Sequence, residues 1–299
     1  MKRMRIPLLI VLGVAIIGII LGSFFDLQIS KAIANPNNYF ALTVSTIGPT
    51  IGFAAVAAMG GGFIAYAVHG KYHIALKILF YVLAAACFGV AIFYPGGEYF
   101  GINGFYHAAP KWLGYIIVLF PESAAMFGGY LLFKECSNKN MWIVFCVVIG
   151  LLLIALLALI PTLKSAIHRP RFRFISQYDT DELFHNWWEP CKNYEALKSL
   201  YHQENDNFKS YPSGHSAEVS ILLVAFTFLP LADRRLEKIQ LPLFLGGCAL
   251  VLLVAFSRIL AAAHFLSDVS WGITIPIALV TIANEIVMRI KAVQPPEEA

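Results

Sequence analysis

Residues 142–161, WIVFCVVIGLLLIALLALIP, decide the fold, because these twenty consecutive positions hold no charged side chain. A helix rises about 1.5 Å per residue, so about 20 residues cross the hydrocarbon core of a bilayer. Seven further apolar blocks predict seven more spans, at roughly residues 6–25, 46–68, 75–95, 112–133, 213–232, 240–258 and 267–290. The sequence therefore predicts an all-α, polytopic integral membrane helix bundle with about eight spans.

Composition indicates the same class of protein. Hydrophobic residues make up 59% of the 299 positions and charged residues only 13%, with a mean hydropathy of +0.70. A soluble domain is nearer a quarter charged. The net charge of +4 is dispersed between apolar blocks, which disfavours nucleic acid as a partner and leaves the lipid bilayer. The five cysteines form no CxxC pair, so neither a disulfide framework nor a zinc site is indicated.

Basic residues predict the orientation of the chain. A cytoplasmic N-terminus places most loop Lys and Arg at the inner face, as the positive-inside rule requires. We therefore predict cytoplasmic N- and C-termini, and interpret the first block as a retained anchor rather than a signal peptide. Eight basic residues fall on the opposite, extracytoplasmic or luminal face: Lys164, Arg169, Arg171, Arg173, Lys192, Lys198, Lys209 and Arg258. Their concentration there indicates a site for negative charge.

One long polar segment interrupts the apolar pattern. Residues 171–212 mix Trp, Tyr and Phe with charges, which predicts an extramembrane loop or a small folded cap rather than a disordered linker. Residues 292–299, AVQPPEEA, are expected to form a frayed tail.

Three stretches at the outer face carry polar residues at the ends of spans. Residues 164–174, KSAIHRPRFRF, follow the fifth span, and residues 211–220, YPSGHSAEVS, open the sixth. Residues 257–268, SRILAAAHFLSD, join the seventh span to the eighth. Each stretch alone has an ordinary interpretation, such as snorkelling cations, a helix start or a surface ion pair. Together the three stretches predict an anion-binding site.

Cations and donors for an anion are the first part of this pattern. Lys164 and Arg171 are seven residues apart, which would place them on one face of a helix. Arg258 lies in an apolar stretch, where a charge is costly unless it faces an interior site. Arginine forks suit phosphate oxygens. Ser213 and the backbone N–H of Gly214, at a helix start, add donors and a favourable dipole.

Two histidines supply acid–base chemistry. His264 and Asp268 stand at i,i+4, so on a helix the carboxylate could reach the imidazole and fix its tautomer. That arrangement suits a nucleophile that attacks phosphorus. His215 has no such partner close in sequence, and it suits a general acid that protonates the leaving oxygen.

The order and spacing of these residues resemble the type 2 phosphatidic acid phosphatase superfamily, whose signature is K-x6-R-P, P-S-G-H and S-R-x5-H-x3-D. Residues 212–215 and 257–268 carry the second and third motifs in full. The first motif departs from the family, because Phe172 stands where the family has Pro. Arg169, followed by a proline, offers a competing register as the phosphate ligand. We prefer Arg171, which keeps the seven-residue spacing to Lys164.

The resemblance implies roles for these residues. His264 would form a phosphohistidine that water hydrolyses, with Asp268 orienting it and His215 as the acid. The phosphate would be held, without metal or cofactor, by Lys164, Arg171, Ser213, Gly214 and Arg258. Family members usually have six core spans, so we expect residues 112–291 to form the phosphatase core and residues 1–111 to be extra N-terminal spans.

The favoured function is a metal-independent, integral-membrane phosphatase acting on a lipid phosphate or diphosphate at the extracytoplasmic or luminal face. One alternative is a phosphatase of a small soluble ester, similar to the glucose-6-phosphatases. Another is a phosphotransferase with an acceptor other than water. A non-catalytic lipid-binding protein is disfavoured because both histidines are present.

Overall fold

The computed structural model describes residues 4–98, 112–134 and 139–289, and within them every regular element is a helix. Eight segments are long and apolar enough to cross a membrane, which confirms the predicted polytopic bundle. Seven are the helices α1 (Arg5–Ile33), α2 (Tyr39–His69), α3 (Ile74–Glu98), α4 (Trp112–Lys134), α5 (Lys139–Ile167), α10 (Glu237–Leu260) and α11 (Leu266–Met288). The eighth joins α8 (Gly214–Val219) to α9 (Ile221–Ala232).

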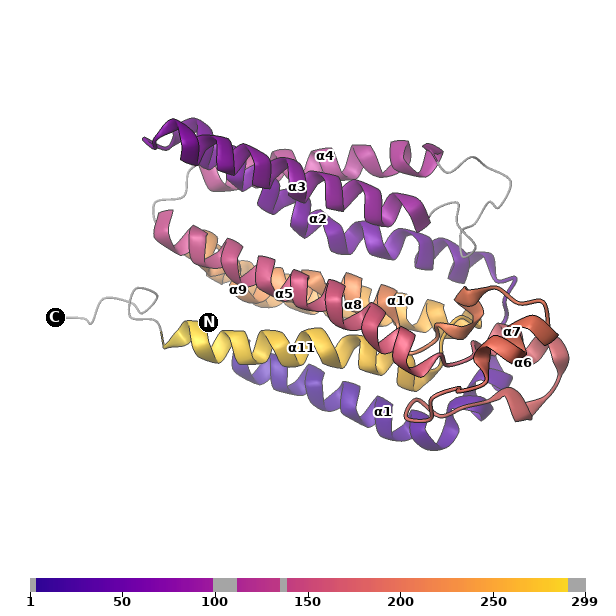
Figure 1. The fold of residues 1–299 in the computed structure, drawn as a ribbon. Helices are drawn as coiled ribbons and strands as arrows, with labels where there is room; N and C mark the ends of the chain where they lie inside the picture. The colour runs from indigo at the N-terminus through magenta and orange to yellow at the C-terminus, as the bar shows by residue number, and fades with distance from the viewer. Residues whose placement is uncertain (1–3, 99–111, 135–138, 290–299) are drawn as a thin grey trace.

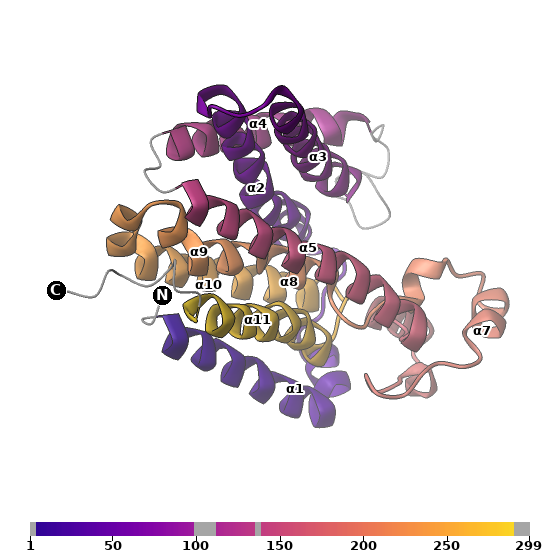
Figure 2. The ribbon, with the colours of Figure 1, turned by 60° about the vertical axis from the view of Figure 1, so that its left-hand side comes forward.

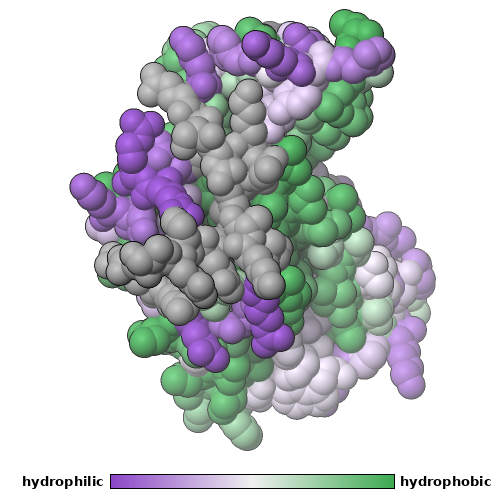
Figure 3. Space-filling model, turned by 90° about the vertical axis from the view of Figure 1, so that its left-hand side faces the viewer, coloured by the Kyte–Doolittle hydropathy of each residue, from purple (hydrophilic) through white to green (hydrophobic). Residues whose placement is uncertain are grey.

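The outward surfaces of these helices are apolar. On α1, Ile6, Ile10 and Ile17 are more than half exposed, whereas Leu8 and Ala15 are buried. Such a helix is stable when its outer face meets lipid rather than water. At the end of the bundle where α1 begins and α11 ends, Figure 3 shows hydrophilic side chains gathered beside hydrophobic flanks. This distribution is that of a membrane-spanning bundle with a polar end.

Helix packing divides the spans differently from the expected boundary at residue 112. The first helix, α1, lies along α11, and α2 packs against α8, α9 and α10. By contrast, α3 and α4 pack chiefly on α2 and on each other, forming a peripheral hairpin at one side of the bundle (Figures 1 and 2). The helices α1 and α2 therefore pack directly on spans of the expected core, and the division of the chain at residue 112 stays a prediction. Hydropathy reports which segments span a membrane, but not which of them touch.

A small folded cap covers one end of the bundle, where α5 ends and α11 begins (Figure 1). Its helices are α6 (Phe172–Tyr178) and α7 (Tyr194–Leu200), with the 3-10 turns η2 (Asp181–Leu183) and η3 (Asn205–Phe208). Phe174, Phe208 and Phe265 belong to its own hydrophobic cluster, which is separate from the core between the spans. The opposite end carries an ion pair between α1 and α11, Arg5 to Glu285 at 3.2 Å. The expected tail, 292–299, lies outside the described residues.

Candidate active site

The three polar stretches meet under the cap. Lys164 lies in the last turn of α5, His215 in α8, and Arg258 in the last turn of α10. His264 lies in the loop that follows α10, and Asp268 in the first turn of α11. All of these side chains are buried except Lys164, which is partly buried. Buried charges are costly unless they are partnered, so their concentration marks a site.

Backbone hydrogen bonds join the three stretches to one another. The N–H of Ser210 donates to the carbonyl oxygen of Arg169 at 3.0 Å, and the N–H of Ser213 donates to that of Asp268 at 3.0 Å. The chain following α5 is thus tied to the chain preceding α8, which is tied to α11. Residues far apart in the sequence are thereby held at fixed relative positions.

Three cations lie around His264. Burial, and after it the positive charges of Arg171, Arg258 and Lys164, hold the pKa of His264 well below its ordinary value. The imidazole is therefore neutral at physiological pH and retains a lone pair for nucleophilic attack. The same three cations would stabilise an anion bound beside this imidazole.

The imidazole of His264 is oriented by Ser210 rather than directly by Asp268. Nδ1 of His264 lies 2.6 Å from the carbonyl oxygen of Ser210 but 4.0 Å from Oδ2 of Asp268, too far for a hydrogen bond. The expected direct contact fails because α10 ends at Leu260 and α11 begins at Leu266, so helical i,i+4 spacing does not apply. A carbonyl can only accept, so Nδ1 carries the proton and Nε2 the lone pair.

The two arginines of the first stretch lie in different environments. Among the neighbouring charges, Arg171 lowers the pKa of His264 the most. Its Nη1 donates to the carbonyl oxygen of Ala263 at 3.4 Å. Its Nη2 donates to Oδ1 of Asp206 at 2.9 Å. Arg169 is instead held between two buried carboxylates. The predicted shared helical face of Lys164 and Arg171 is wrong, because α5 ends at Ile167.

The start of α8 lies beside Lys164. Ser213 is the N-cap of this helix, and its Oγ accepts from the N–H of Ser216 at 3.5 Å. A Cβ atom placed on Gly214 would lie 3.7 Å from Nζ of Lys164 and 3.2 Å from Oε1 of Glu218. The missing side chain at Gly214 keeps the space beside the ammonium open.

Glu218 was missed by the sequence analysis. Its Oε2 lies 3.9 Å from Nδ1 of His215, at i,i+3 on α8, and its charge also influences Lys164. The signal was present, because a His-x2-Glu spacing on a helix places both side chains on one face. Glu218 thus places a carboxylate beside the histidine to which the resemblance gives the role of general acid.

Comparison with known proteins supports the motifs. No curated protein and no solved structure gave a match to the chain. The family model of the PAP2 superfamily matches residues 139–291, about half of the chain, and this region holds all three polar stretches. With eight candidate spans and these motifs in order, the chain belongs to the PAP2 superfamily, whose members are phosphatases.

Proposed function

We propose that the protein hydrolyses the phosphate or diphosphate ester of a membrane lipid through a phosphohistidine on His264, without a metal ion. Arg171, Arg258 and Lys164 bind the phosphoryl oxygens, with donors from Ser213 and the N–H of Gly214 (the phosphate site). The proposal rests on the family, on the cations around a neutral imidazole, and on an apolar pocket that adjoins the phosphate site.

The proposed reaction has two steps. Nε2 of His264 attacks phosphorus while the bond from phosphorus to the lipid oxygen breaks, and protonated His215 gives its proton to that oxygen. The modified imidazole keeps its proton on Nδ1 and is therefore cationic, and the carbonyl of Ser210 and the nearby carboxylate of Asp268 stabilise it. Water then attacks phosphorus, His215 takes its proton, and the phosphorus–nitrogen bond breaks to release inorganic phosphate.

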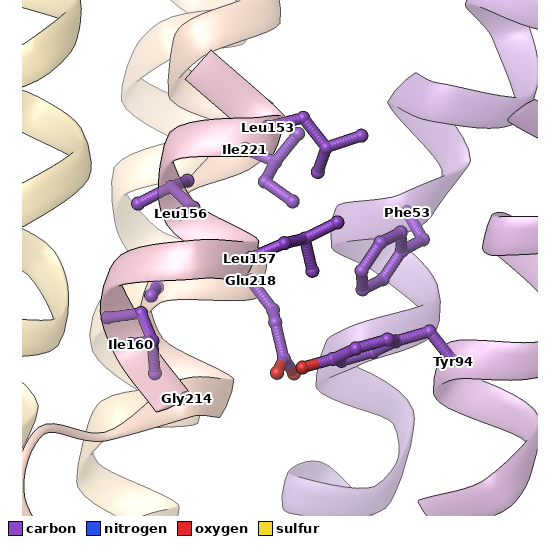
Figure 4. Close-up of a pocket in the computed structure, with 10 residues that line it drawn as sticks. Phe53, Tyr94, Leu153, Leu156, Leu157, Ile160, Gly214, Glu218 and Ile221 are labelled. Atoms are coloured by element: carbon purple, nitrogen blue, oxygen red, sulfur yellow. The ribbon is translucent and has the colours of Figure 1, made fainter. Parts of the chain in front are cut away.

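The apolar pocket carries the lipid part of the proposal. It is lined mainly by apolar side chains of α2, α5 and α8–α9, among them Phe53, Leu157 and Ile160. Gly214 belongs both to this pocket and to the phosphate site. Figure 4 shows Glu218 and Tyr94 pointing toward one another at the polar end of the pocket. We infer that the first carbons of a hydrocarbon chain lie against these side chains when its phosphate group occupies the phosphate site.

The distribution of basic loop residues favours an extracytoplasmic or luminal position for the site. The site lies at the capped end of the bundle, whereas the Arg5–Glu285 pair lies at the other end. The polar end opposite the cap carries basic loop residues such as Lys71 and Arg235, so the positive-inside rule assigns it to the cytoplasm. Both helix termini at that end, of α1 and α11, are then cytoplasmic.

Filling the pocket should impair lipid substrates selectively. We expect Leu157→Trp to raise KM for dioleoyl phosphatidate about tenfold and to change KM for p-nitrophenyl phosphate less than about threefold, because the added ring displaces only the hydrocarbon chain. Phosphate release is measured in detergent with EDTA. Further substrates are an isoprenyl diphosphate, a sphingoid-base phosphate and glucose 6-phosphate.

The matched control is Leu151→Trp, on the same helix, because Leu151 is 63% exposed on the outer face. This variant should behave like wild type. A preference for glucose 6-phosphate over every lipid, together with an unaffected Leu157→Trp variant, would assign the protein to soluble esters instead. Release of the phosphoryl group only in the presence of an alcohol acceptor would make it a phosphotransferase.

Removing the charge of Glu218 should impair protonation of the leaving group. Glu218→Gln is expected to lower kcat about tenfold for phosphatidate, whose alkoxide leaving group needs a proton from His215. The same change should lower kcat less than about threefold for p-nitrophenyl phosphate, whose phenolate leaves without protonation. An equal loss on both substrates would show that Glu218 supports the site in another way.

A further inference from the structure

Arg169 lies at the centre of a buried network that reaches from the first span to the site. Its side chain is fully buried, and each guanidinium nitrogen donates to an acceptor. Nη1 donates to Oδ1 of Asp268 at 2.6 Å, Nη2 to Oδ2 of Asp26 at 2.9 Å, and Nε to the carbonyl oxygen of His185 at 2.7 Å. The centroid of the Phe265 ring lies 4.3 Å from the guanidinium carbon. The orientation of Arg169 is therefore fixed from all sides.

Asp26 supplies the anchor of this network from α1. It is buried, and its Oδ1 accepts from the N–H of Ser267 at 2.9 Å, while Oδ2 also accepts from the hydroxyl of Ser267. The helices approach closely here, since a Cβ on Gly22 would lie only 2.6 Å from the nitrogen of Ser267. Asp26 thus joins α1 to the start of α11. It lies outside the region matched by the family model.

Both carboxylate oxygens of Asp268 accept hydrogen bonds. Oδ1 is occupied by Arg169, and Oδ2 accepts from the hydroxyl of Ser210 at 2.5 Å and from the N–H of Phe265 at 2.9 Å. Ser210 in turn accepts from His264 through its carbonyl. The carboxylate of Asp268 therefore fixes Ser210, and Ser210 fixes the imidazole of His264. If Oδ1 lost its partner, the carboxylate could rotate and release Ser210.

We propose that Asp26 and Arg169 are positioning residues, which lock the carboxylate of Asp268 so that Ser210 holds His264 with Nε2 directed at the phosphate site. The proposal rests on the proposed function for its kinetic consequence. Because Asp26 and Arg169 reach the reaction only through Asp268 and Ser210, their removal should reduce kcat and leave phosphate binding unchanged.

Removing Asp26 and Arg169 together tests whether they position Asp268 or only balance the charge of the network. The variant Asp26→Leu/Arg169→Met removes one negative and one positive charge, so the net charge of the network is unchanged. Apolar replacement of a buried ion pair is often tolerated by the fold. We expect kcat for phosphatidate to fall about 10- to 100-fold, with KM and the inhibition constant of orthovanadate within about threefold of wild type. Wild-type kcat in the folded double variant would overturn the proposal.

Two further variants complete the kinetic test. Asp26→Asn keeps the shape of the side chain and should also lower kcat about tenfold without raising KM, so it serves if the double variant does not fold. Asp181→Asn removes the exposed partner of Lys31 at the same end of α1 and should leave activity unchanged. A rise in KM equal to the fall in kcat would contradict a positioning role.

A spectroscopic readout keeps this test independent of the substrate. In protein labelled with ¹⁵N-imidazole histidine, the signals of His264 are assigned from their loss in His264→Gln. We expect a proton on Nδ1 alone in the wild type, and a mixture of tautomers in the double variant. If the wild type hydrolyses no phosphate ester, the proposed function fails and the spectrum alone decides. An unchanged tautomer in the double variant would then overturn the proposal.

Discussion

Replacing His264 by glutamine should abolish phosphate release and the covalent intermediate together. We expect kcat to fall by at least about 10⁴-fold, because loss of a nucleophile removes the whole covalent pathway. Rapid acid-free quenching of the wild type with ³²P-labelled phosphatidate should trap a base-stable phosphohistidine, and the variant should give none. EDTA should change neither result, since no step of the proposed mechanism uses a metal ion.

The matched control is His69→Gln. His69 is exposed at the end of α2, contacts Tyr130 at 3.0 Å and lies away from the cap, so its loss should leave turnover unchanged. Substantial activity in His264→Gln, or trapped phosphate on another residue, would assign the nucleophile elsewhere. Turnover abolished by EDTA would point to a metal-assisted hydrolysis instead.

Hydropathy predicted the spans well, because in a bilayer every backbone polar group must be satisfied within the helix itself. The block at 142–161 corresponds to α5, which extends to Ile167. The block at 213–232 contains two helices, α8 and α9, that meet at Ser220. What hydropathy could not predict was adjacency. Nothing in the apolar pattern of α1 indicates that it packs along α11, the last helix of the chain.

The residues of the site were predictable to the extent that function requires their side chains. Lys164, Arg258 and His264 stood out because charges and histidines at the ends of apolar spans need an explanation. The residues that hold them did not stand out, because they act through backbone atoms or through partners distant in sequence. Ser210 orients His264 with its carbonyl, which any residue type possesses. Asp26 could have been noticed as an acid directly after an apolar block.

Local sequence spacing predicted the wrong geometry where the backbone leaves the helix. Lys164 and Arg171 were expected on one helical face, but His168, just beyond the end of α5, has a positive φ of 48°. The two cations still approach the same imidazole, because the chain after α5 returns under the cap. Spacing in the motif therefore predicted two cations that lie near one imidazole, but for a reason other than helical periodicity.

Replacing Arg171 by glutamine should weaken anion binding and shift the pH profile. Loss of a buried, charge-assisted contact to phosphate should lower kcat/KM about 10²- to 10³-fold and raise the inhibition constant of orthovanadate by a similar factor. His264 must be neutral to attack, so activity falls as the pH drops through its pKa. Since Arg171 helps to hold the pKa of His264 below its ordinary value, the variant should have a higher pKa there. The acid limb of its residual activity should therefore move to higher pH.

The comparison with Arg169 decides which arginine binds the phosphate. Removing Arg169 alone would leave two buried carboxylates without their cation, so the control is the double variant Asp26→Leu/Arg169→Met. We expect its orthovanadate inhibition constant and its acid limb to match those of the wild type, although its kcat is lower. If the double variant loses orthovanadate binding while Arg171→Gln retains it, Arg169 is the ligand. The two variants thus separate a residue that binds the phosphate from one that orients the nucleophile.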